Sequence, residues 1–302
     1  MIIARLQGGL GNQMFQYASS LRLAMKHRTE LKLDLATLLD RTPRENMVFR
    51  DYDLDLFRIP EQIATSRETR KFLRRLDPGS LTLLERIEDK LVKRSLFQEQ
   101  TYKFDPQILA LADETYLDGY FQNEKYFADI EDAIRERCKF PDSDFDLPDH
   151  TRELAEAVQS AGSVCLNVRR GDFVSNPRSA NYHGACGLDY FARSAAWMAE
   201  RIKVPRFFVF SDDPDWCREN IRLLHDVTFV GPENNGPRFF HMFWLMSQCR
   251  HFIIPNSSFG WWAAWLATHP GKQVVCPAQW FRAPEVRDVD ICPASWTRLP
   301  NS

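Results

Sequence analysis

Two adjacent arginines, Arg169 and Arg170, are the residues of this 302-residue sequence best suited to bind an anion. They follow an apolar run, residues 164–168, that predicts a buried strand, and they precede Gly171 and Asp172. Guanidinium groups at the end of a buried strand cost free energy unless an anionic group meets them. The planar fork of an arginine suits phosphate oxygens. The pattern indicates anion binding, and an ion pair with a local carboxylate such as Asp172 stays open as the alternative.

Polar residues also follow two other predicted strands, 206–210 and 251–254. In open α/β sheets ligands bind beyond the carboxyl ends of the strands, so these residues are expected at the same crevice as Arg169. They are Asp212, Asp213, Asn256, Ser257 and Ser258. Such residues cap helices, and the backbone N–H groups at the start of a helix also bind phosphates. The residue types leave both interpretations open.

No metal site is predicted. Asp213-Pro214-Asp215 has the spacing of an Asp-x-Asp metal motif, but Pro214 is better explained as the first helical residue after a capping Asp213. The seven histidines are dispersed and lack the i, i+4 spacing of helical metal ligands. Arginines and helix N-termini can neutralise a nucleotide diphosphate in place of a cation.

A glycine-rich turn near the N-terminus is a second candidate for ligand contact. Residues 2–6 predict a strand, and apolar residues within 14–25 recur at helical spacing. Between them lie Gly9, Gly11 and Asn12, where backbone N–H groups can approach a ligand at the positive end of a helix dipole. A tight turn that contacts no ligand stays open.

The same turn raises a dinucleotide alternative. Residues 31–34 predict a second strand that ends in Asp34, at the place where an acid binds the ribose of NAD. The G-x-G-x-x-G fingerprint is incomplete, because Met14 stands where its third glycine belongs. The signal for NAD is therefore weak.

The elements that must position these residues alternate regularly along the second half of the chain. Helices are predicted at 152–159, 189–201, 216–224, 239–248 and 258–266. Strands are predicted at 164–168, 206–210, 227–230, 251–254 and 273–276. This alternation indicates a parallel, doubly wound sheet. With a further strand near 115–122, we predict two α/β domains, 1–148 and 149–302, joined by the acidic, proline-bounded segment 140–148.

Residues 61–95 predict a helical insertion in the first domain, with a turn at 77–80. Arginine and lysine outnumber acidic residues in this segment. A peripheral membrane contact and a solvated helical hairpin both fit the composition, and the pattern favours the hairpin.

Composition narrows the class of protein. The formal net charge of -2 gives no electrostatic case for nucleic acid as a partner. No apolar run approaches the roughly 18 residues that a membrane-spanning helix needs. The first residues lead directly into a predicted strand, so no signal peptide is expected. The seven cysteines are scattered without Cys-x-x-Cys spacing, which is typical of reduced, buried thiols in a cytoplasmic protein.

The sequence resembles the α-1,2-fucosyltransferases of glycosyltransferase family 11 and, more distantly, the α-1,6- and protein O-fucosyltransferases. Five motifs carry the resemblance, in the order of the family: residues 8–18, 118–127, 167–173, 210–213 and 256–266. The family usually has His at the first and Tyr at the last position of the central motif. Asn167 and Phe173 occupy those positions here. Asparagine can make a hydrogen bond where histidine would, but it cannot become charged.

The resemblance implies a GT-B-like fold, with two Rossmann-type domains facing across a cleft, and the use of GDP-fucose without a metal or other cofactor. Arg169 would hold the β-phosphate and stabilise departing GDP. Asn167 and Asp212 or Asp213 would lie near the nucleoside. Three residues would cap the phosphates: Asn256, Ser257 and Ser258. The turn at Gly9, Gly11 and Asn12 would close over the donor from the first domain.

The reaction expected from the resemblance is inverting transfer of L-fucose to the 2-hydroxyl of a galactose-containing acceptor. Asp172 and His183, which we expect in a polar loop, are the candidates for the general base. Asp172 is equally suited to orient one of the arginines. Tyr120, Gln122 and Lys125 are candidates for the acceptor side.

Two other functions remain as alternatives: a nicotinamide-dependent oxidoreductase, and a non-catalytic nucleotide- or sugar-binding module of the same fold. The aromatic cluster Trp261, Trp262 and Trp265 has the spacing of a helix packed in the core, which we favour over a sugar-stacking platform.

Overall fold

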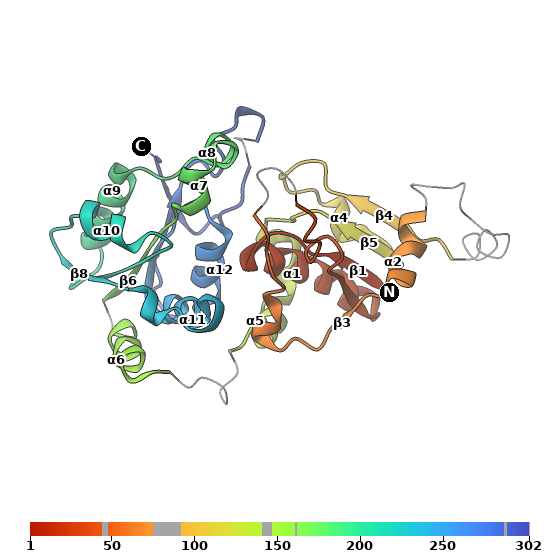
Figure 1. Ribbon diagram of the computed structural model, residues 1–302, viewed down its shortest axis with the longest axis horizontal. Coiled ribbons are helices and arrows are strands. Elements are labelled where there is room, and N and C mark those ends of the chain that lie inside the picture. The colour runs from red at the N-terminus through yellow and green to blue at the C-terminus, as the bar shows by residue number, and fades with distance from the viewer. Residues whose placement is uncertain (44–47, 75–91, 141–146, 161, 287–288, 302) are drawn as a thin grey trace. The chain divides into compact units, whose positions relative to one another are not determined.

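The computed structural model describes residues 1–43, 48–74, 92–140, 147–160, 162–286 and 289–301. These residues form two compact units, Met1–Lys139 and Phe140–Ser302, and each unit contains one parallel sheet (Figure 1). The α/β class and the two Rossmann-type units expected for a GT-B-like fold are confirmed. This division and the predicted boundary at 148/149 both fall between the last helix of the first unit and the first helix of the second. The cleft between the domains stays a prediction.

The first unit is built on a five-stranded sheet in the order β3-β2-β1-β5-β4. Its strands are β1 (Ile2–Arg5), β2 (Leu31–Asp34), β3 (Gln62–Ile63), β4 (Ser95–Gln98) and β5 (Thr115–Asp118). The central strand β1 pairs with β2 on one side and β5 on the other, and Ile2 and Ile3 are fully buried. A strand that has neighbours on both sides and helices on its faces must be apolar. The apolar run of residues 2–6 therefore predicts a strand.

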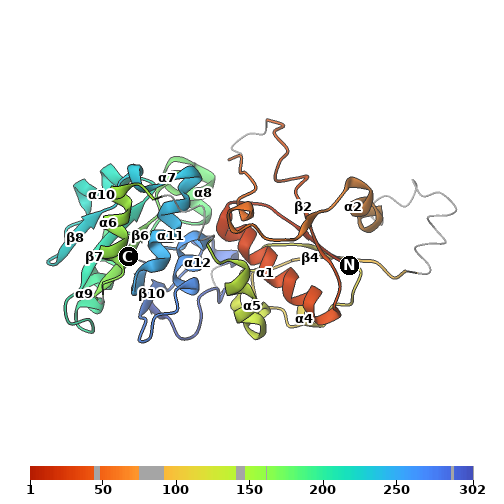
Figure 2. The ribbon, with the colours of Figure 1, turned by 90° about the horizontal axis from the view of Figure 1, so that it is seen from below.

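Helix α1 (Leu10–His27) packs against β1 and β2 (Figure 2). The other helical elements among the described residues of this unit are η1 (Leu54–Phe57), α2 (Ser66–Leu73), α4 (Gln107–Ala110), η4 (Glu124–Tyr126), η5 (Ala128–Ile130) and α5 (Glu131–Arg137). Most of α1 is buried, but Met25, expected on its apolar face, is 46% exposed. Met25 lies in the last turn of α1, where it lines a pocket beside the start of β2.

The predicted helical insertion 61–95 is only partly a helix. It contains β3 and α2, and β4 begins at its end. Thr65 starts α2 with a reciprocal capping box to Glu68. Residues 75–91, with the predicted turn at 77–80, lie outside the described residues.

The second unit has a six-stranded sheet in the order β11-β10-β9-β6-β7-β8. Its strands are β6 (Ser163–Val168), β7 (Arg206–Ser211), β8 (Asp226–Phe229), β9 (His251–Ile253), β10 (Val274–Pro277) and β11 (Thr297–Leu299). Strands β6, β7 and β8 follow one another outward in one direction, and β9, β10 and β11 in the other. The chain therefore reverses its direction of winding between β6 and β9, and ligands of doubly wound sheets bind at such a switch point.

The helices of the second unit are α6 (Asp149–Val158), α7 (Gly171–Ser175), α8 (Pro177–Tyr182), α9 (Leu188–Ala199), α10 (Pro214–Asn220), α11 (Phe240–Gln248) and α12 (Ser258–Leu266). Three 3₁₀ turns complete it: η6 (Pro232–Asn234), η7 (Pro237–Phe239) and η8 (Pro284–Val286). The predicted alternation of strands and helices is confirmed. Helices α7 and α8 and strand β11 were not predicted.

Helix α12 is a core helix. Trp261 and Trp262 are fully buried, and Trp265 is 5% exposed. The Trp261 indole N–H donates to the backbone oxygen of Ile291 at 3.1 Å. The prediction that this cluster packs in the core is confirmed. Within the described part of the chain, no helix has both the length and the apolar character needed to cross a membrane.

Candidate functional site

The carboxyl end of β6 places Arg169 between two carboxylates. Its guanidinium donates to Asp172 Oδ1, and its Nη1 lies 2.8 Å from Asp212 Oδ2. The side chain is 27% exposed, so one side of this cation faces solvent while the other is neutralised by protein. The salt-bridge role considered for Asp172 is the one observed.

Arg170 ties the end of β6 to the end of β7. Its backbone N–H donates to Asp212 Oδ1 at 2.8 Å, and its Nε donates to Asp213 Oδ2 at 3.1 Å. The guanidinium lies 3.6 Å from the ring centroid of Trp216, a cation–π distance. Two neighbouring arginines thus have different surroundings. Arg170, 21% exposed, links the ends of two strands and packs on an aromatic ring, whereas Arg169, 27% exposed, lies between two carboxylates.

Gly171 permits this arrangement. A Cβ atom at position 171 would lie only 2.5 Å from Asp212 Oδ2, which is closer than real Cβ contacts allow. A larger residue would displace the carboxylate that holds both arginines. The sequence analysis did not predict this requirement, because nothing in the sequence around Gly171 indicates that Asp212 packs against it.

The Asp-x-Asp segment serves the start of α10. Asp213 Oδ1 accepts the Trp216 backbone N–H at 3.2 Å, and Pro214 occupies the first turn, as predicted for a capped helix. Asp215 forms an exposed ion pair with Arg218 at 2.8 Å. Among the described residues, no group of three or more histidine, cysteine, aspartate or glutamate side chains is gathered as metal ligands would be.

Asn167 is buried on β6, under the first turn of α12. Its Nδ2 donates to the backbone oxygen of Phe210 at 3.2 Å, which links β6 to β7. A Cβ at Gly260 would lie 2.5 Å from Asn167 Oδ1, so α12 can approach this strand closely only with glycine there. The Nδ2 group of this amide is therefore engaged within the protein.

Asn256 differs from its predicted place at the phosphates. It is 2% exposed, and its Nδ2 lies at 3.0 Å from the backbone oxygen of His183 and 2.9 Å from that of Gly184. The same nitrogen is 3.0 Å from the backbone oxygen of Trp280. Buried polar atoms require such partners, so this side chain fixes the backbone of two other segments. It is not free to cap a phosphate.

Ser257 and Ser258 begin α12 at the switch point. Ser257 occupies the N-cap position, but its side chain makes no capping hydrogen bond. Both serines are half-buried. The capping alternative is therefore not realised by the Ser257 side chain, and phosphate binding at this helix start stays a prediction.

The polar loop predicted around His183 is wrong. Helices α7 and α8 occupy it, because Asn176 caps α8 by accepting the backbone N–H groups of Arg178 and Ser179, with Pro177 in the first turn. His183 immediately follows α8, and its ring stacks on Phe173 with a centroid distance of 4.6 Å and an interplanar angle of 6°.

His183 is poorly suited to act as a general base. The pKa of its imidazole is lowered to about 4, mainly by burial and also by the neighbouring Arg169, while Asp172 opposes the shift. A group with this pKa stays neutral at pH 7 and takes up a proton weakly. The stack of His183 on Phe173 was missed in the sequence, because the two residues belong to different helical segments.

The predicted glycine turn of the first unit is shorter than expected, because α1 begins at Leu10. Gly9 is the N-cap residue, and Gly11 and Asn12 lie in the first helical turn. Asn12 Oδ1 accepts a hydrogen bond from Gln122 Nε2 at 2.8 Å, which joins this turn to the segment after β5. Strands β1 and β5 are neighbours in this sheet, so the segments that follow their carboxyl ends bring these polar groups together.

The carboxylate required by the dinucleotide alternative is already engaged. Asp34 is 6% exposed, and its Oδ2 accepts the hydroxyl of Tyr116 at 2.6 Å. Its Oδ1 accepts the backbone N–H of Ala36 at 2.9 Å. The side chain is used within the core and is not presented to a ribose.

The three acceptor-side candidates differ in their surroundings. Gln122 is 7% exposed and bound to Asn12, as above. Tyr120 stacks on Tyr102 with 5.9 Å between the ring centroids. Lys125 is exposed, with its Nζ 5.6 Å from the ring centroid of Phe104. Contact with an acceptor stays a prediction for all three.

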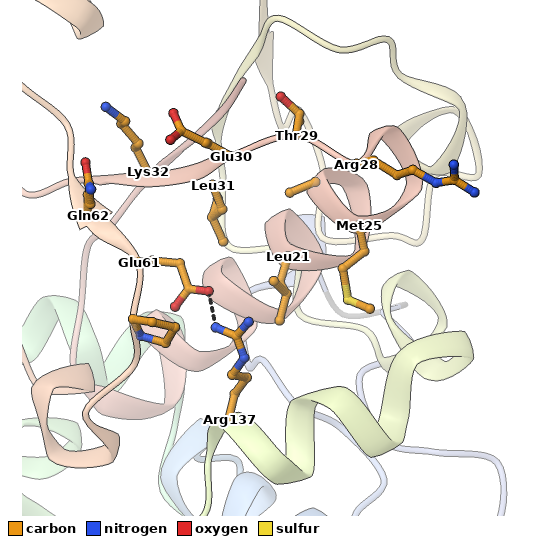
Figure 3. A pocket seen from close by; sticks show the side chains of 12 residues that line it. Leu21, Met25, Arg28, Thr29, Glu30, Leu31, Lys32, Glu61, Gln62 and Arg137 are labelled. Atoms are coloured by element: carbon orange, nitrogen blue, oxygen red, sulfur yellow. Dashed lines mark hydrogen bonds and ion pairs between the residues drawn. The ribbon is translucent and has the colours of Figure 1, made fainter.

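A separate pocket of about 410 Å³ lies in the first unit (Figure 3). It is lined by Leu21, Ala24, Met25, Arg28, Thr29, Glu30, Leu31, Lys32, Pro60, Glu61, Gln62 and Arg137. None of the predicted site residues lines it. Because β2 begins at Leu31, the pocket lies at the amino ends of the strands, opposite the edge where ligands of such sheets bind.

Comparison with known proteins places the chain among the glycosyltransferases. A family model described as Glycosyl transferase family 11 matches residues 97–299, and the chain belongs to this family. The predicted resemblance is confirmed.

Relatives span the whole chain. An α-1,2-colitosyltransferase of Escherichia coli is 32% identical over 298 residues, covering 96% of each chain. The O-antigen biosynthesis glycosyltransferase WbnK of Escherichia coli is 30% identical and covers 91% of this chain and 93% of its own. Among solved structures, the fucosyltransferase NodZ of Bradyrhizobium is 16% identical, with a TM-score of 0.45, over 87% of this chain and 91% of its own.

Proposed function

We propose that this protein transfers a 6-deoxyhexose of the fucose type from its GDP-activated form to the 2-hydroxyl of a galactose-containing glycan. The transfer is a single displacement with inversion at the sugar, and it uses no metal and no other cofactor. Family membership supports glycosyl transfer, and two relatives support the 2-position: the α-1,2-colitosyltransferase and a galactoside α-(1,2)-fucosyltransferase of Aotus azarae.

The observation that carries the proposal is the position of Arg169 at the switch point of the second sheet. Its guanidinium stands where β6 ends, and it is 27% exposed between the carboxylates of Asp172 and Asp212. A diphosphate brings more negative charge than either carboxylate and can replace one of them on the open face. A preorganised cation there stabilises the charge that develops as GDP departs.

The roles of the other residues follow from their contacts. Asp172 orients Arg169, and Arg170 holds the turn through Asp212 and Asp213. One of these aspartates accepts the guanine N–H groups when the donor binds, with Asn167 behind them. The start of α12 at Ser257 and Ser258 supplies N–H groups to the phosphates. From the first unit, Gly9, Gly11 and Asn12 approach the donor.

The identity of the sugar on the GDP donor needs a separate argument. The name of one relative specifies colitose, which is fucose without its 3-hydroxyl. We therefore propose GDP-fucose as the donor and treat GDP-colitose as the competing donor. Incubating the enzyme with each donor and a panel of β-galactosides, followed by linkage analysis, decides between them. An α-1,2-fucosylated product supports the proposal, and exclusive use of GDP-colitose contradicts it.

The role of Arg169 is tested by Arg169→Ala. Removing one preorganised donor typically costs about 10²–10³ in rate, so we expect GDP release in the presence of acceptor to fall by at least about that factor. Arg206→Ala is the matched control, because Arg206 begins the neighbouring strand β7 at its opposite end. The circular dichroism spectrum of Arg169→Ala should match that of the wild type, which shows that the variant is folded. Turnover like that of the wild type would contradict the assignment.

Metal independence and the two alternative functions are tested with the same enzyme. We expect EDTA to leave turnover unchanged, and loss that Mn²⁺ restores would overturn this part of the proposal. Thermal stabilisation by NAD but not GDP would favour the oxidoreductase. GDP binding without turnover of either donor across the acceptor panel would favour a non-catalytic module.

We also propose a cytoplasmic location, which the seven buried free thiols support.

A further inference from the structure

His183 has a half-buried ring that the proposed chemistry does not use. Its Nδ1 is buried and has no hydrogen-bond partner among the described residues. The face of the ring, in contrast, is fully engaged. It lies parallel to Phe173 at 4.6 Å, and the tilted ring of Phe281 is 5.5 Å away. This histidine is therefore held by its faces and not by hydrogen bonds from Nδ1.

The backbone beneath this ring is also fixed. Asn256 holds the carbonyl oxygens of His183 and Gly184, at 3.0 and 2.9 Å. The backbone oxygen of Tyr182 accepts the N–H groups of Arg282 and Ala283 at 3.0 and 3.1 Å. Two strand-end segments, one after β9 and one after β10, thus hold the residues that end α8.

Phe173 transmits this support to the site. Its ring lies against His183 on one side, and the guanidinium carbon of Arg169 is 5.5 Å from its centroid. The carboxylates of Asp172 and Asp212 hold two nitrogens of the guanidinium, and the ring of Phe173 adds an aromatic contact to it. An aromatic ring that is itself stacked on a second ring restricts the guanidinium further, because a cation is attracted to the ring face.

We propose that His183 is a positioning residue for Arg169. Its ring supports Phe173, Phe173 supports the guanidinium, and Asn256 fixes the backbone that carries the histidine. The orientation of Arg169 toward a diphosphate is thereby set by residues that touch no substrate. This inference rests on the proposed function for the identity of the ligand, but not for the arrangement of the side chains.

Two substitutions of His183 distinguish the contribution of its ring face from that of its ring nitrogens. His183→Phe keeps a flat ring that can stack on Phe173, whereas His183→Ala removes it. We expect His183→Ala to weaken GDP binding about tenfold, measured by titration calorimetry, and His183→Phe to stay within about threefold of the wild type. His241→Ala is the matched control. His241 is a buried histidine of the same unit and lies in the first turn of α11. It should bind GDP as the wild type does.

Coupling to Arg169 tests the route of the effect. In an Arg169→Gln background, His183→Ala should cause no further loss of GDP affinity, since both changes act on the same cation. Equal losses in both backgrounds would show that His183 acts elsewhere. A loss in His183→Phe as large as in His183→Ala would also overturn the proposal. If His183→Ala fails to fold, Phe173→Leu serves in its place, because it removes the aromatic face and keeps the apolar volume.

A readout without any ligand distinguishes this inference from the proposed function. The Nε–H resonance of Arg169, identified by its loss in Arg169→Gln, reports directly on the restraint of the guanidinium. We expect it to be sharp in the wild type and in His183→Phe, and broadened by exchange in His183→Ala. An unchanged resonance in His183→Ala contradicts the positioning role. If GDP does not bind the wild type at all, the proposed function fails while this comparison still holds.

Discussion

At the scale of single residues, the same residue type has two roles at adjacent positions. Arg170 is enclosed by Asp213 and Trp216, and its backbone is bound to Asp212. Arg169 shares Asp212 but keeps an open face. Partly exposed ion pairs contribute up to about 1 kcal/mol each, so a diphosphate can displace one of them without unfolding the turn. The two side chains are similarly exposed, 27% for Arg169 and 21% for Arg170, so their contacts, and not residue type or exposure, separate the proposed binding arginine from the structural one.

His183 should make the stability of the protein depend on pH. Burial lowers its pKa from 6.5 to about 4, so between these values the unfolded chain binds a proton that the folded chain does not. Stability from the neutral imidazole is present above pH 6.5 and is lost as the pH falls toward 4. Relative to His183→Phe, we expect the free energy of unfolding of the wild type to drop by about 2 kcal/mol between pH 7.5 and 5.

Urea unfolding at both pH values measures this difference. Other groups titrate in the same range, but they are common to both proteins and cancel in the comparison. Parallel pH dependence of the wild type and His183→Phe would show that this imidazole is not kept neutral by the fold.

At the scale of elements, an ion pair joins α5 to the segment before β3. Glu61 is 7% exposed, and its Oε1 accepts from Arg137 Nη1 at 2.5 Å, as the dashed line in Figure 3 shows. Its Oε2 accepts the hydroxyl of Tyr17, a buried residue of α1, at 3.0 Å. The burial of Tyr17 and the neighbouring carboxylate both raise the pKa of its hydroxyl, which therefore stays a donor. One carboxylate connects three segments of the first unit.

Removing the cation should leave that carboxylate buried and unpaired. We expect Arg137→Ala to lower the free energy of unfolding by about 2 kcal/mol, less than for a fully buried pair because Arg137 is 37% exposed. Arg135→Ala is the control on the same helix. It removes an exposed i, i+4 pair with Glu131 and should cost at most about 0.5 kcal/mol. Equal effects in urea unfolding would contradict the buried role of Glu61.

At the scale of the whole molecule, both units keep their thiols inside. All seven cysteines are free and buried: Cys138, Cys165, Cys186, Cys217, Cys249, Cys276 and Cys292. Burial raises the pKa of the Cys138 and Cys186 thiols to about 12. The thiolate is the reactive form, so these groups are protected both by access and by protonation. The predicted reduced, buried state of the cysteines is confirmed for the fold.

A thiol reagent should therefore distinguish the folded from the unfolded chain. We expect Ellman's reagent at pH 8 to label fewer than about one thiol per native molecule within minutes, and all seven after denaturation in guanidinium chloride. The absorbance of the released thiolate gives the count. Rapid labelling of several thiols in the native protein would show that one of the two units opens in solution.

Local interactions made much of this protein predictable from its sequence alone. The strand before Arg169 is an apolar run with strand neighbours on both sides, and Asp213 caps α10 within three residues of itself. The tryptophans of α12 repeat at helical spacing. Each of these features depends on residues that are close together in the chain, or on the burial of a segment that its apolar residues predict. The five motifs, taken together and in order, identified the family.

The tertiary structure decided what the polar side chains of the site do. Asn256 binds backbone 72 and 73 residues away, Asp34 is engaged by Tyr116, and His183 supports Phe173. A buried polar group must find partners wherever packing brings them, and no local pattern records which distant segment that will be. Asparagine, aspartate and histidine suit ligands and the protein interior equally well by residue type. Only the packing of the strands and helices determines which of these roles each side chain takes.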